Sequence, residues 1–346
     1  SEESMDEHDE HEEGDEHDDH DEEGEHDHDH DAEAVMLSLP ELTAVELDGR
    51  PLRVVATTNI IGDVVANIGG DAIELTTLMG PGVDPHSYEA TATDFAAVAD
   101  ADVIFVNGWN LEEGLVEDLE TAAEGALIVV ISAGIEPLEF GEDGHGHDDE
   151  HDDEQEEGEH SEHDHGGADP HVWFSVHNVE QWAINAEAVL HELDPANHDS
   201  YEANLESYLE ELEALDDYVH EQIETIPAEN RKLVTNHDSF GYFADEHDFE
   251  VIGTIIPAAS TTAEPSASDL AELIEEMNEE SVCTIFTENT VSTQLADTVA
   301  AELATCDSVQ VLPLLTGSLG PVGAPTDSYI GFTRTNIDTI VNGLSQ

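Results

Sequence analysis

The sequence predicts an α/β fold of two Rossmann-like (βα) lobes, each with a mainly parallel sheet, joined by one long rigid helix. In both halves of the chain, short runs rich in β-branched residues alternate with segments of helical spacing, which is typical of parallel strands joined by βαβ crossovers. Between the halves, apolar residues recur every three to four positions over 197–226. A helix of that length spans roughly 40 Å at about 1.5 Å per residue, which is enough to connect two lobes.

The individual elements follow from these patterns. In the first half we expect strands at 52–56, 73–79, 103–107 and 127–131, with helices at 60–68, 91–99, 112–123 and 176–193. In the second half we expect strands at 232–235, 249–256, 282–287 and 309–312, with helices at 268–278, 292–304 and 329–344. The resulting domains are a tail at 1–50, a first lobe at 51–195, a linking helix at 196–226 and a second lobe at 227–346.

The charge of the chain is extreme. Its 346 residues include 86 acidic and only 5 basic side chains, for a formal charge of −81. Such a chain repels nucleic acid and anionic lipid headgroups, so binding to either through charge is strongly disfavoured. High ionic strength shortens the Debye length to about 3 Å at 1 M and removes most of the self-repulsion. We therefore expect a halophilic protein that works in molar salt.

Two low-complexity segments alternate acidic residues with histidine. The first occupies residues 1–34 and the second residues 141–167, which contain six histidines. The first segment has no apolar periodicity and is expected to be disordered, as a solubilising tether. The imidazoles of both segments are expected to bind metal weakly, as auxiliary metal-collecting segments.

Two copies of the tripeptide Asp-Pro-His, at 84–86 and 169–171, point to a metal site. Proline fixes its own φ and moves the preceding residue out of the helical region, so His86 and His171 are each presented from a stiff loop. A third candidate, His237, follows the strand expected at 232–235. Three neutral imidazoles suit Zn²⁺ best, whereas Mn²⁺ prefers more oxygen ligands.

A fourth ligand is expected from the second lobe. Asp327 is the first choice because it precedes a helix and follows a Gly/Pro-rich loop, and Glu288, after the strand at 282–287, is the alternative. The five remaining histidines outside the low-complexity segments are expected at the surface: His177, His191, His198, His220 and His247.

The cysteines and the hydropathy of the chain bear on whether the protein is exported. Cys283 and Cys306 form either a disulfide or two buried thiols, and both alternatives stay open at this point. No run approaches the ~20 apolar residues of a membrane span. We expect an exported protein whose leader or lipid anchor preceded Ser1.

Five stretches carry a resemblance to a known family: GPGVDPHSYEAT, ADPHVWFSVHN, ANHDSYEANLESYLEELEALD, TNHDSFGYF and TDSYIGFTRTN. Together they resemble the zinc/manganese solute-binding proteins of ABC transporters (cluster A-I), and in particular the high-affinity zinc-uptake receptors. The resemblance implies two (βα) lobes joined by one long helix. It also implies that His86, His171, His237 and Asp327 ligate the metal. Manganese-type members of the family usually carry Glu at the third ligand position, so the resemblance of His237 to that position points to zinc. The His-rich loop before the second Asp-Pro-His is also a mark of zinc-type members.

The function implied by this resemblance is that of a receptor and not an enzyme. It would capture Zn²⁺ between the lobes, as a monomer at the outer face of the membrane, and deliver it to a permease and ATPase complex. The alternatives are a surface metal buffer or adhesin, a manganese receptor and, less favoured, a zinc hydrolase. A hydrolase would need a general base such as Asp238 or Glu288, and the sequence has no HExxH-type pairing.

Overall fold

The computed structural model describes residues 36–112, 114–123, 125–139 and 167–345, and these described residues fall in one compact unit. The expectations for the acidic tail and for most of the His-rich loop concern residues 1–35 and 140–166, which lie outside the described residues. Within the described part, no helix is both long and apolar enough to cross a membrane.

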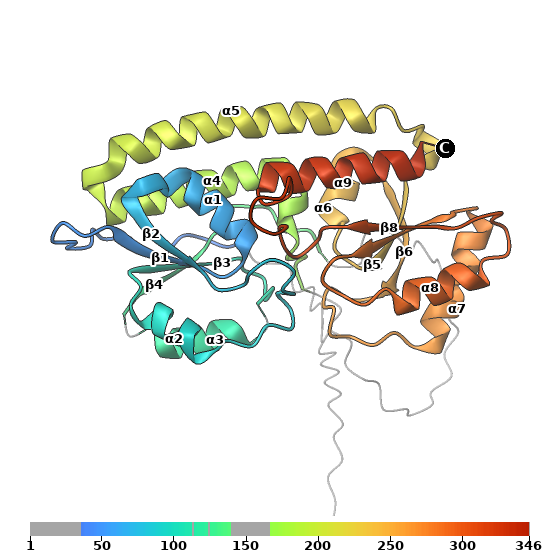
Figure 1. Ribbon diagram of the computed structural model, residues 1–346, viewed down its shortest axis with the longest axis horizontal. Coiled ribbons are helices and arrows are strands. Elements are labelled where there is room, and N and C mark those ends of the chain that lie inside the picture. The colour runs from blue at the N-terminus through green and yellow to red at the C-terminus, as the bar shows by residue number, and fades with distance from the viewer. Residues whose placement is uncertain (1–35, 113, 124, 140–166, 346) are drawn as a thin grey trace, which may run out of the picture. The chain divides into compact units, whose positions relative to one another are not determined.

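The first lobe is built on a four-stranded parallel sheet in the order β2-β1-β3-β4 (Figure 1). Its strands are β1 (Leu52–Ala56), β2 (Ile73–Thr77), β3 (Val103–Val106) and β4 (Leu127–Val130). Helices α1 (Asn59–Gly69) and α4 (Val176–Leu193) cover one face, and α2 (Ala92–Ala99) and α3 (Leu115–Ala122) cover the other. Because both faces are covered, all four residues of β3 are buried and its sequence is a continuous apolar run.

The second lobe repeats this plan. Strand β5 (Lys232–His237) pairs in parallel with β6 (Glu250–Ile256), and β7 (Thr284–Glu288) pairs in parallel with β8 (Gln310–Leu314). Strands β5 and β7 are neighbours. The helices are α6 (Gly241–His247), α7 (Ala267–Glu279), α8 (Gln294–Glu302) and α9 (Tyr329–Leu344). The predicted α/β class is therefore confirmed, although the short helix α6 was not foreseen.

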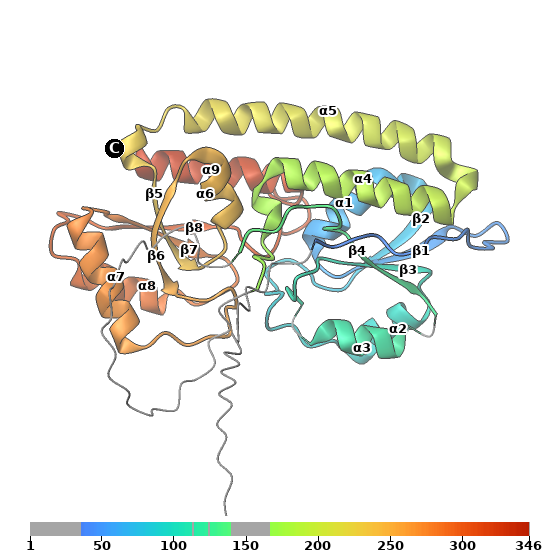
Figure 2. The same ribbon diagram turned by 180° about the vertical axis from the view of Figure 1, so that it is seen from behind.

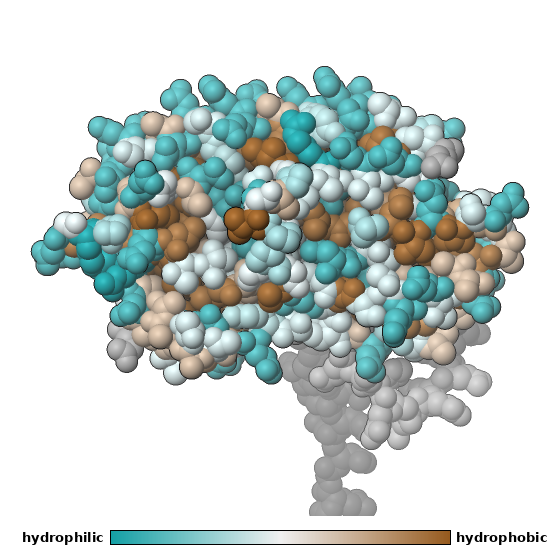
Figure 3. Space-filling view, viewed as in Figure 1, coloured by the Kyte–Doolittle hydropathy of each residue, from teal (hydrophilic) through white to brown (hydrophobic). Residues whose placement is uncertain are grey.

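The long helix α5 (His198–Ile223) joins the two lobes. It packs against α1 and α4 of the first lobe and against α9 of the second, as both views show (Figures 1 and 2). Its buried stripe is Tyr201, Tyr208, Leu212, Leu215, Val219 and Ile223. Hydrophilic residues dominate the edge of the molecule that α5 forms (Figure 3). An amphipathic helix of 26 residues is thus fixed to both lobes along its length, as predicted.

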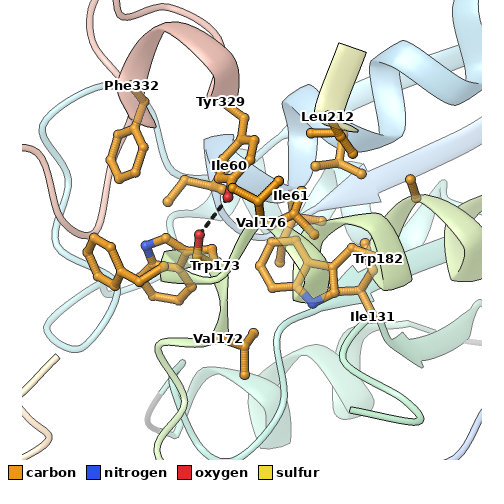
Figure 4. Packing of buried hydrophobic residues seen from close by; sticks show 14 of the residues in the cluster. Ile60, Ile61, Ile131, Val172, Trp173, Val176, Trp182, Leu212, Tyr329 and Phe332 are labelled. Carbon is orange, nitrogen blue, oxygen red and sulfur yellow. Dashed lines mark hydrogen bonds between the residues drawn. The ribbon is translucent and has the colours of Figure 1, made fainter. Parts of the chain in front are cut away.

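An aromatic cluster fills the space between the lobes. The 3₁₀ turn η2 (Val172–Phe174) carries Trp173, whose indole N–H donates to the carbonyl of Thr316 at 3.0 Å. The Tyr329 hydroxyl donates to the Trp173 carbonyl at 2.8 Å (Figure 4). Since η2 starts directly after His171, this packing also fixes the second Asp-Pro-His segment.

Three local expectations are resolved by the structure. The helix expected at 112–123 begins only at Leu115, because Gly114 adopts a left-handed conformation with φ of 68°. His247, expected at the surface, is 5% exposed and packs its ring against Phe243. The two cysteines form a disulfide, with 5.7 Å between the Cα atoms of Cys283 and Cys306.

Candidate metal centre

Three imidazoles from the two lobes converge on one point. Nε2 of His171 lies 3.2 Å from Nε2 of His86 and 3.2 Å from Nε2 of His237. All three side chains are buried, with residue exposures of 6%, 1% and 2% for His86, His171 and His237. A tetrahedral ion with bonds of about 2.1 Å holds its donors about 3.4 Å apart, so this spacing matches a shared metal ion.

The two Asp-Pro-His segments form the same turn. In the first, the carboxylate of Asp84 accepts a hydrogen bond from the backbone N–H of His86 at 3.1 Å. In the second, Asp169 accepts from the backbone N–H of His171 at 2.9 Å. This Asx turn is the local reason for the repeated tripeptide, because the aspartate holds the histidine backbone while proline stiffens the bend.

Both lobes hold the second turn in place. The carbonyl of Pro170 accepts a hydrogen bond from the side-chain amide of Asn107, which follows β3. The carbonyl of Asp169 accepts from the hydroxyl of Tyr242, which lies on α6. Gly241, at the start of α6, allows this approach, because a Cβ there would stand 2.7 Å from the Asp169 carboxylate.

His237 is placed by the carboxyl ends of two parallel strands. It is the last residue of β5, and Glu288 is the last residue of β7. The Glu288 carboxylate accepts from the backbone N–H of His237 at 3.0 Å and, through its second oxygen, from the Thr316 hydroxyl at 2.8 Å. Ligand sites of open parallel sheets lie at such strand ends.

Two buried carboxylates contact the outer nitrogens of the rings. Asp169 lies 2.7 Å from Nδ1 of His171, and Glu288 contacts Nδ1 of His237. Metal-ligating histidines commonly donate their second N–H to a carboxylate, which fixes the tautomer and orients the ring. The arrangement therefore leaves the Nε2 atoms of both rings facing the common point.

Burial and mutual charge shift the pKa values of these groups. Burial raises the pKa of Asp169 to about 7. Burial, with help from the two neighbouring imidazoles, lowers the pKa of His171 well below its usual value. For His237, burial acts downward, but the Glu288 carboxylate outweighs it and raises the pKa. His171 is thus neutral and ready to ligate, whereas His237 competes for a proton.

Neither carboxylate expected as the fourth ligand belongs to the group of converging donors. Asp327 is exposed, and its carboxylate accepts a hydrogen bond from the backbone N–H of Gly323 at 2.6 Å. Glu288 is buried, but it contacts the nitrogen of His237 that points away from the other imidazoles. The identity of the fourth ligand stays a prediction.

Sequence reasoning found the three histidines but missed the groups that orient them: Asp169, Gly241, Tyr242 and Asn107. The repeated Asp before Pro-His was the one signal that could have found Asp169, since an aspartate two residues before a backbone N–H is an Asx-turn signature. Tyr242 and Gly241 belong to α6 and are brought to the site by the fold alone.

The lobes also contact each other beside the imidazoles. The Asp84 carboxylate accepts from the hydroxyl of Thr261 at 2.6 Å, and the backbone N–H of Gly82 donates to the hydroxyl of Ser318 at 2.7 Å. Both bonds join the loop that carries His86 to the second lobe. With the imidazoles buried, this is a closed arrangement around the site.

Comparison with known proteins finds relatives that match most of the chain. Residues 54–343 match the family model described as zinc-uptake complex component A, periplasmic (ZnuA). The chain is 31% identical over 304 residues to the manganese-binding lipoprotein MntA of Halalkalibacterium halodurans, covering 88% of this chain and 92% of that protein. It is 34% identical over 312 residues to the zinc-binding protein TroA of Treponema pallidum, covering 86% and 90%.

Solved structures show the same fold. The periplasmic zinc-binding protein TroA from Treponema pallidum superposes with a TM-score of 0.74 and 31% identity, covering 86% of this chain and all of that chain. A manganese-bound periplasmic metal-binding protein (S38A mutant) from Candidatus Liberibacter asiaticus gives a TM-score of 0.71 and 29% identity, covering 84% and 98%. Because the family model matches residues 54–343 and the solved structures share the fold, we conclude that the chain belongs to the ZnuA family of metal-binding receptors of ABC importers.

Proposed function

We propose that the protein is the extracytoplasmic zinc receptor of an ABC importer. It captures Zn²⁺ between its lobes and delivers the ion to a membrane permease and its ATPase. The observation that carries the choice of metal is the convergence of three imidazole Nε2 atoms within 3.2 Å contacts. An all-imidazole set favours zinc, because manganese prefers carboxylate, carbonyl and water oxygen.

The manganese alternative has support from relatives named as manganese-binding proteins. The two orienting carboxylates contact Nδ1 atoms and so stay on the outer side of the imidazoles. We propose His86, His171 and His237 as ligands through Nε2. The fourth position is then filled by Asp327 or by water, or by Glu288 after its carboxylate leaves Nδ1 of His237, and single variants of the two acids separate these cases.

Binding and release require the closed arrangement to open. The His86 loop is tied to the second lobe by the Asp84–Thr261 and Gly82–Ser318 hydrogen bonds. Helix α5 packs on both lobes and limits their relative rotation. We therefore propose that the ion enters through local movement of the His86 loop and not through wide separation of the lobes.

The same arrangement favours a binding role over hydrolysis. A zinc hydrolase needs a carboxylate or imidazole placed to activate the metal-bound water. The Glu288 carboxylate is held by the His237 backbone and the Thr316 hydroxyl. We propose that it orients the His237 imidazole as a metal ligand and does not activate water. We propose no catalytic residue. The lipid anchor, the outer-face location and the auxiliary role of the His-rich segments belong to the same proposal.

Calorimetric titration of the full chain with Zn²⁺ and with Mn²⁺ tests the proposal. One tight zinc site is expected, with manganese weaker by at least about a hundredfold. His171→Ala should abolish it, whereas His198→Ala, a surface control, should keep it. Deleting residues 144–165, which lie outside the described residues, should also keep it. Tighter binding of manganese, or a tight zinc site that survives His171→Ala, would refute the assignment.

A further inference from the structure

A second group of metal-ligating side chains lies outside the three-histidine site. Nδ1 of His177 on α4 is 3.8 Å from Oδ1 of Asp216 on α5 and 3.7 Å from Oε1 of Glu246 on α6. All three donor atoms lie within 4.8 Å of one another. The two separations from His177 are only a few tenths of an ångström wider than the ~3.4 Å between donors around a tetrahedral zinc ion.

The surroundings of this group suit a cation. It borders a pocket of about 620 Å³ whose lining includes His177, His220 and Glu246. The His220 imidazole lies beside it, with Nδ1 3.1 Å from the backbone carbonyl oxygen of Asp216 and 3.4 Å from Oδ2 of the same residue. The other oxygen of Asp216, Oδ1, is buried and has no hydrogen-bond partner. A buried carboxylate oxygen without a donor is costly unless a cation or water satisfies it.

Negative charge accumulates around the same point. Burial raises the pKa of Glu246, and the nearby carboxylate of Asp216 adds to the effect. Burial likewise raises the pKa of Glu180, with contributions from Asp216, Glu213 and Glu246. A bound divalent cation would relieve this crowding.

No basic side chain neutralises these acids, because all five in the chain are engaged elsewhere. Arg50 pairs with Asp102, Arg53 with Asp100 and Lys232 with Glu280. Arg231 donates to backbone carbonyls, including that of His247, and Arg334 stacks over the ring of Tyr218.

We propose that His177, Asp216 and Glu246, with His220 at the rim, form a second and weaker site for a divalent transition cation such as zinc. The proposal goes beyond the receptor function and does not depend on it. His177 follows His171 by six positions, and Glu246 follows His237 by nine. A cation here would tie α6 to α4 and α5, and so brace the two segments that carry primary histidines.

The test uses the full chain in a His171→Ala background, so that the three-histidine site does not contribute. Because the His-rich segments are proposed to bind metal as well, the readouts must be local. Crystals soaked in ZnCl₂ should give an anomalous peak at the zinc edge between His177, Asp216 and Glu246. In solution, zinc should slow amide hydrogen exchange in α6 by at least about threefold.

Matched variants make the outcome decisive. Asp216→Asn and His177→Gln should each abolish the peak and the slowing. Asp217→Asn makes the same charge change at the next, exposed position of α5 and should preserve both. The proposal is overturned if the peak is absent, or if zinc leaves α6 exchange unchanged. It is also overturned if the slowing persists in both Asp216→Asn and His177→Gln. If instead the three-histidine site does not bind zinc, the calorimetric titration of chains that retain His171 would reveal it, and the variants described here would not.

Discussion

The carboxylate of Glu288 contacts Nδ1 of His237, while Nε2 of the same ring lies 3.2 Å from Nε2 of His171. One side of the imidazole thus faces a buried acid and the other faces the proposed metal position. The acid orients the ring for binding and also strengthens its hold on a proton, since it raises the pKa of His237 above the usual 6.5. Metal and proton therefore compete for this histidine near neutral pH.

Glu288→Gln should change the pH dependence of zinc binding. In the unsubstituted protein, affinity is full above the raised pKa of His237 and falls as pH drops through it, by about tenfold per pH unit for each proton released. Without the carboxylate, burial still lowers the pKa of the ring and only the smaller contributions of Asp84 and Asp238 oppose it, so the fall begins at a lower pH. At pH 8 the variant should bind zinc about 10- to 100-fold more weakly, because the orienting partner is weaker.

Competition with a chromophoric chelator from pH 5.5 to 8.5 measures these profiles. Glu279→Gln, at an exposed position of α7, is the matched control and should follow the unsubstituted curve. Parallel curves for Glu288→Gln and the unsubstituted protein would show that Glu288 does not set the protonation of His237.

Gly241→Ala should loosen the second Asp-Pro-His turn. The added Cβ would stand 2.7 Å from the Asp169 carboxylate, which is already held by the backbone and ring nitrogens of His171. The carboxylate must shift, and zinc affinity should fall by roughly tenfold. Gly167→Ala, where nothing lies within 4 Å of the new Cβ, is the control for calorimetric comparison. Unchanged affinity in Gly241→Ala would mean that Asp169 does not position His171.

Much of the fold follows from the sequence because hydrophobic periodicity and turn residues act locally. The strand at Leu52–Ala56 and the helices at Val176–Leu193 and Tyr329–Leu344 have the expected bounds. The short helix α6 escaped prediction because its apolar residues, Tyr242, Phe243 and Ala244, are a single run whose burial in the hydrophobic core is a tertiary effect. Seven residues are too few for periodicity to distinguish a helix from a loop.

The residues of the site also divide into those that local sequence features predict and those that only the fold brings together. His86 and His171 stood out because proline and aspartate fix their backbone locally, and His237 because it ends a strand. The contact of Glu288 with His237 joins residues 51 positions apart and depends on β5 lying beside β7. The group formed by His177, Asp216 and Glu246 was likewise hidden, because three different helices supply it.

Asp63→Asn should stabilise the protein at neutral pH. Asp63 accepts from the backbone N–H of Tyr329 at 2.9 Å, yet burial raises its pKa to about 6 from the ordinary 3.8. The folded state then holds more protons than the unfolded state between these values, so this group costs stability as pH rises from about 4 to 6. An asparagine oxygen keeps the hydrogen bond without the buried charge.

The expected gain in free energy of unfolding is on the order of 2 kcal/mol at pH 7.5, and it should vanish below about pH 4. Urea denaturation at several pH values, in the same salt, measures it. Asp71→Asn, at an exposed position just beyond α1, should change stability little at any pH. A loss of stability at pH 7.5 in Asp63→Asn would show that the carboxylate charge is needed at the start of α9.

Salt should stabilise the folded protein strongly. With 86 acidic residues and every basic side chain already engaged, like charges repel across the surface. Raising NaCl from 0.1 to 2 M shortens the screening length from about 10 Å to below about 3 Å. Thermal unfolding followed by circular dichroism should give a rise in Tm on the order of 10 °C, or a few kcal/mol for a domain of this size. Sucrose at equal osmolality, which does not screen charge, should give a much smaller rise, and a Tm independent of NaCl would contradict the charge argument.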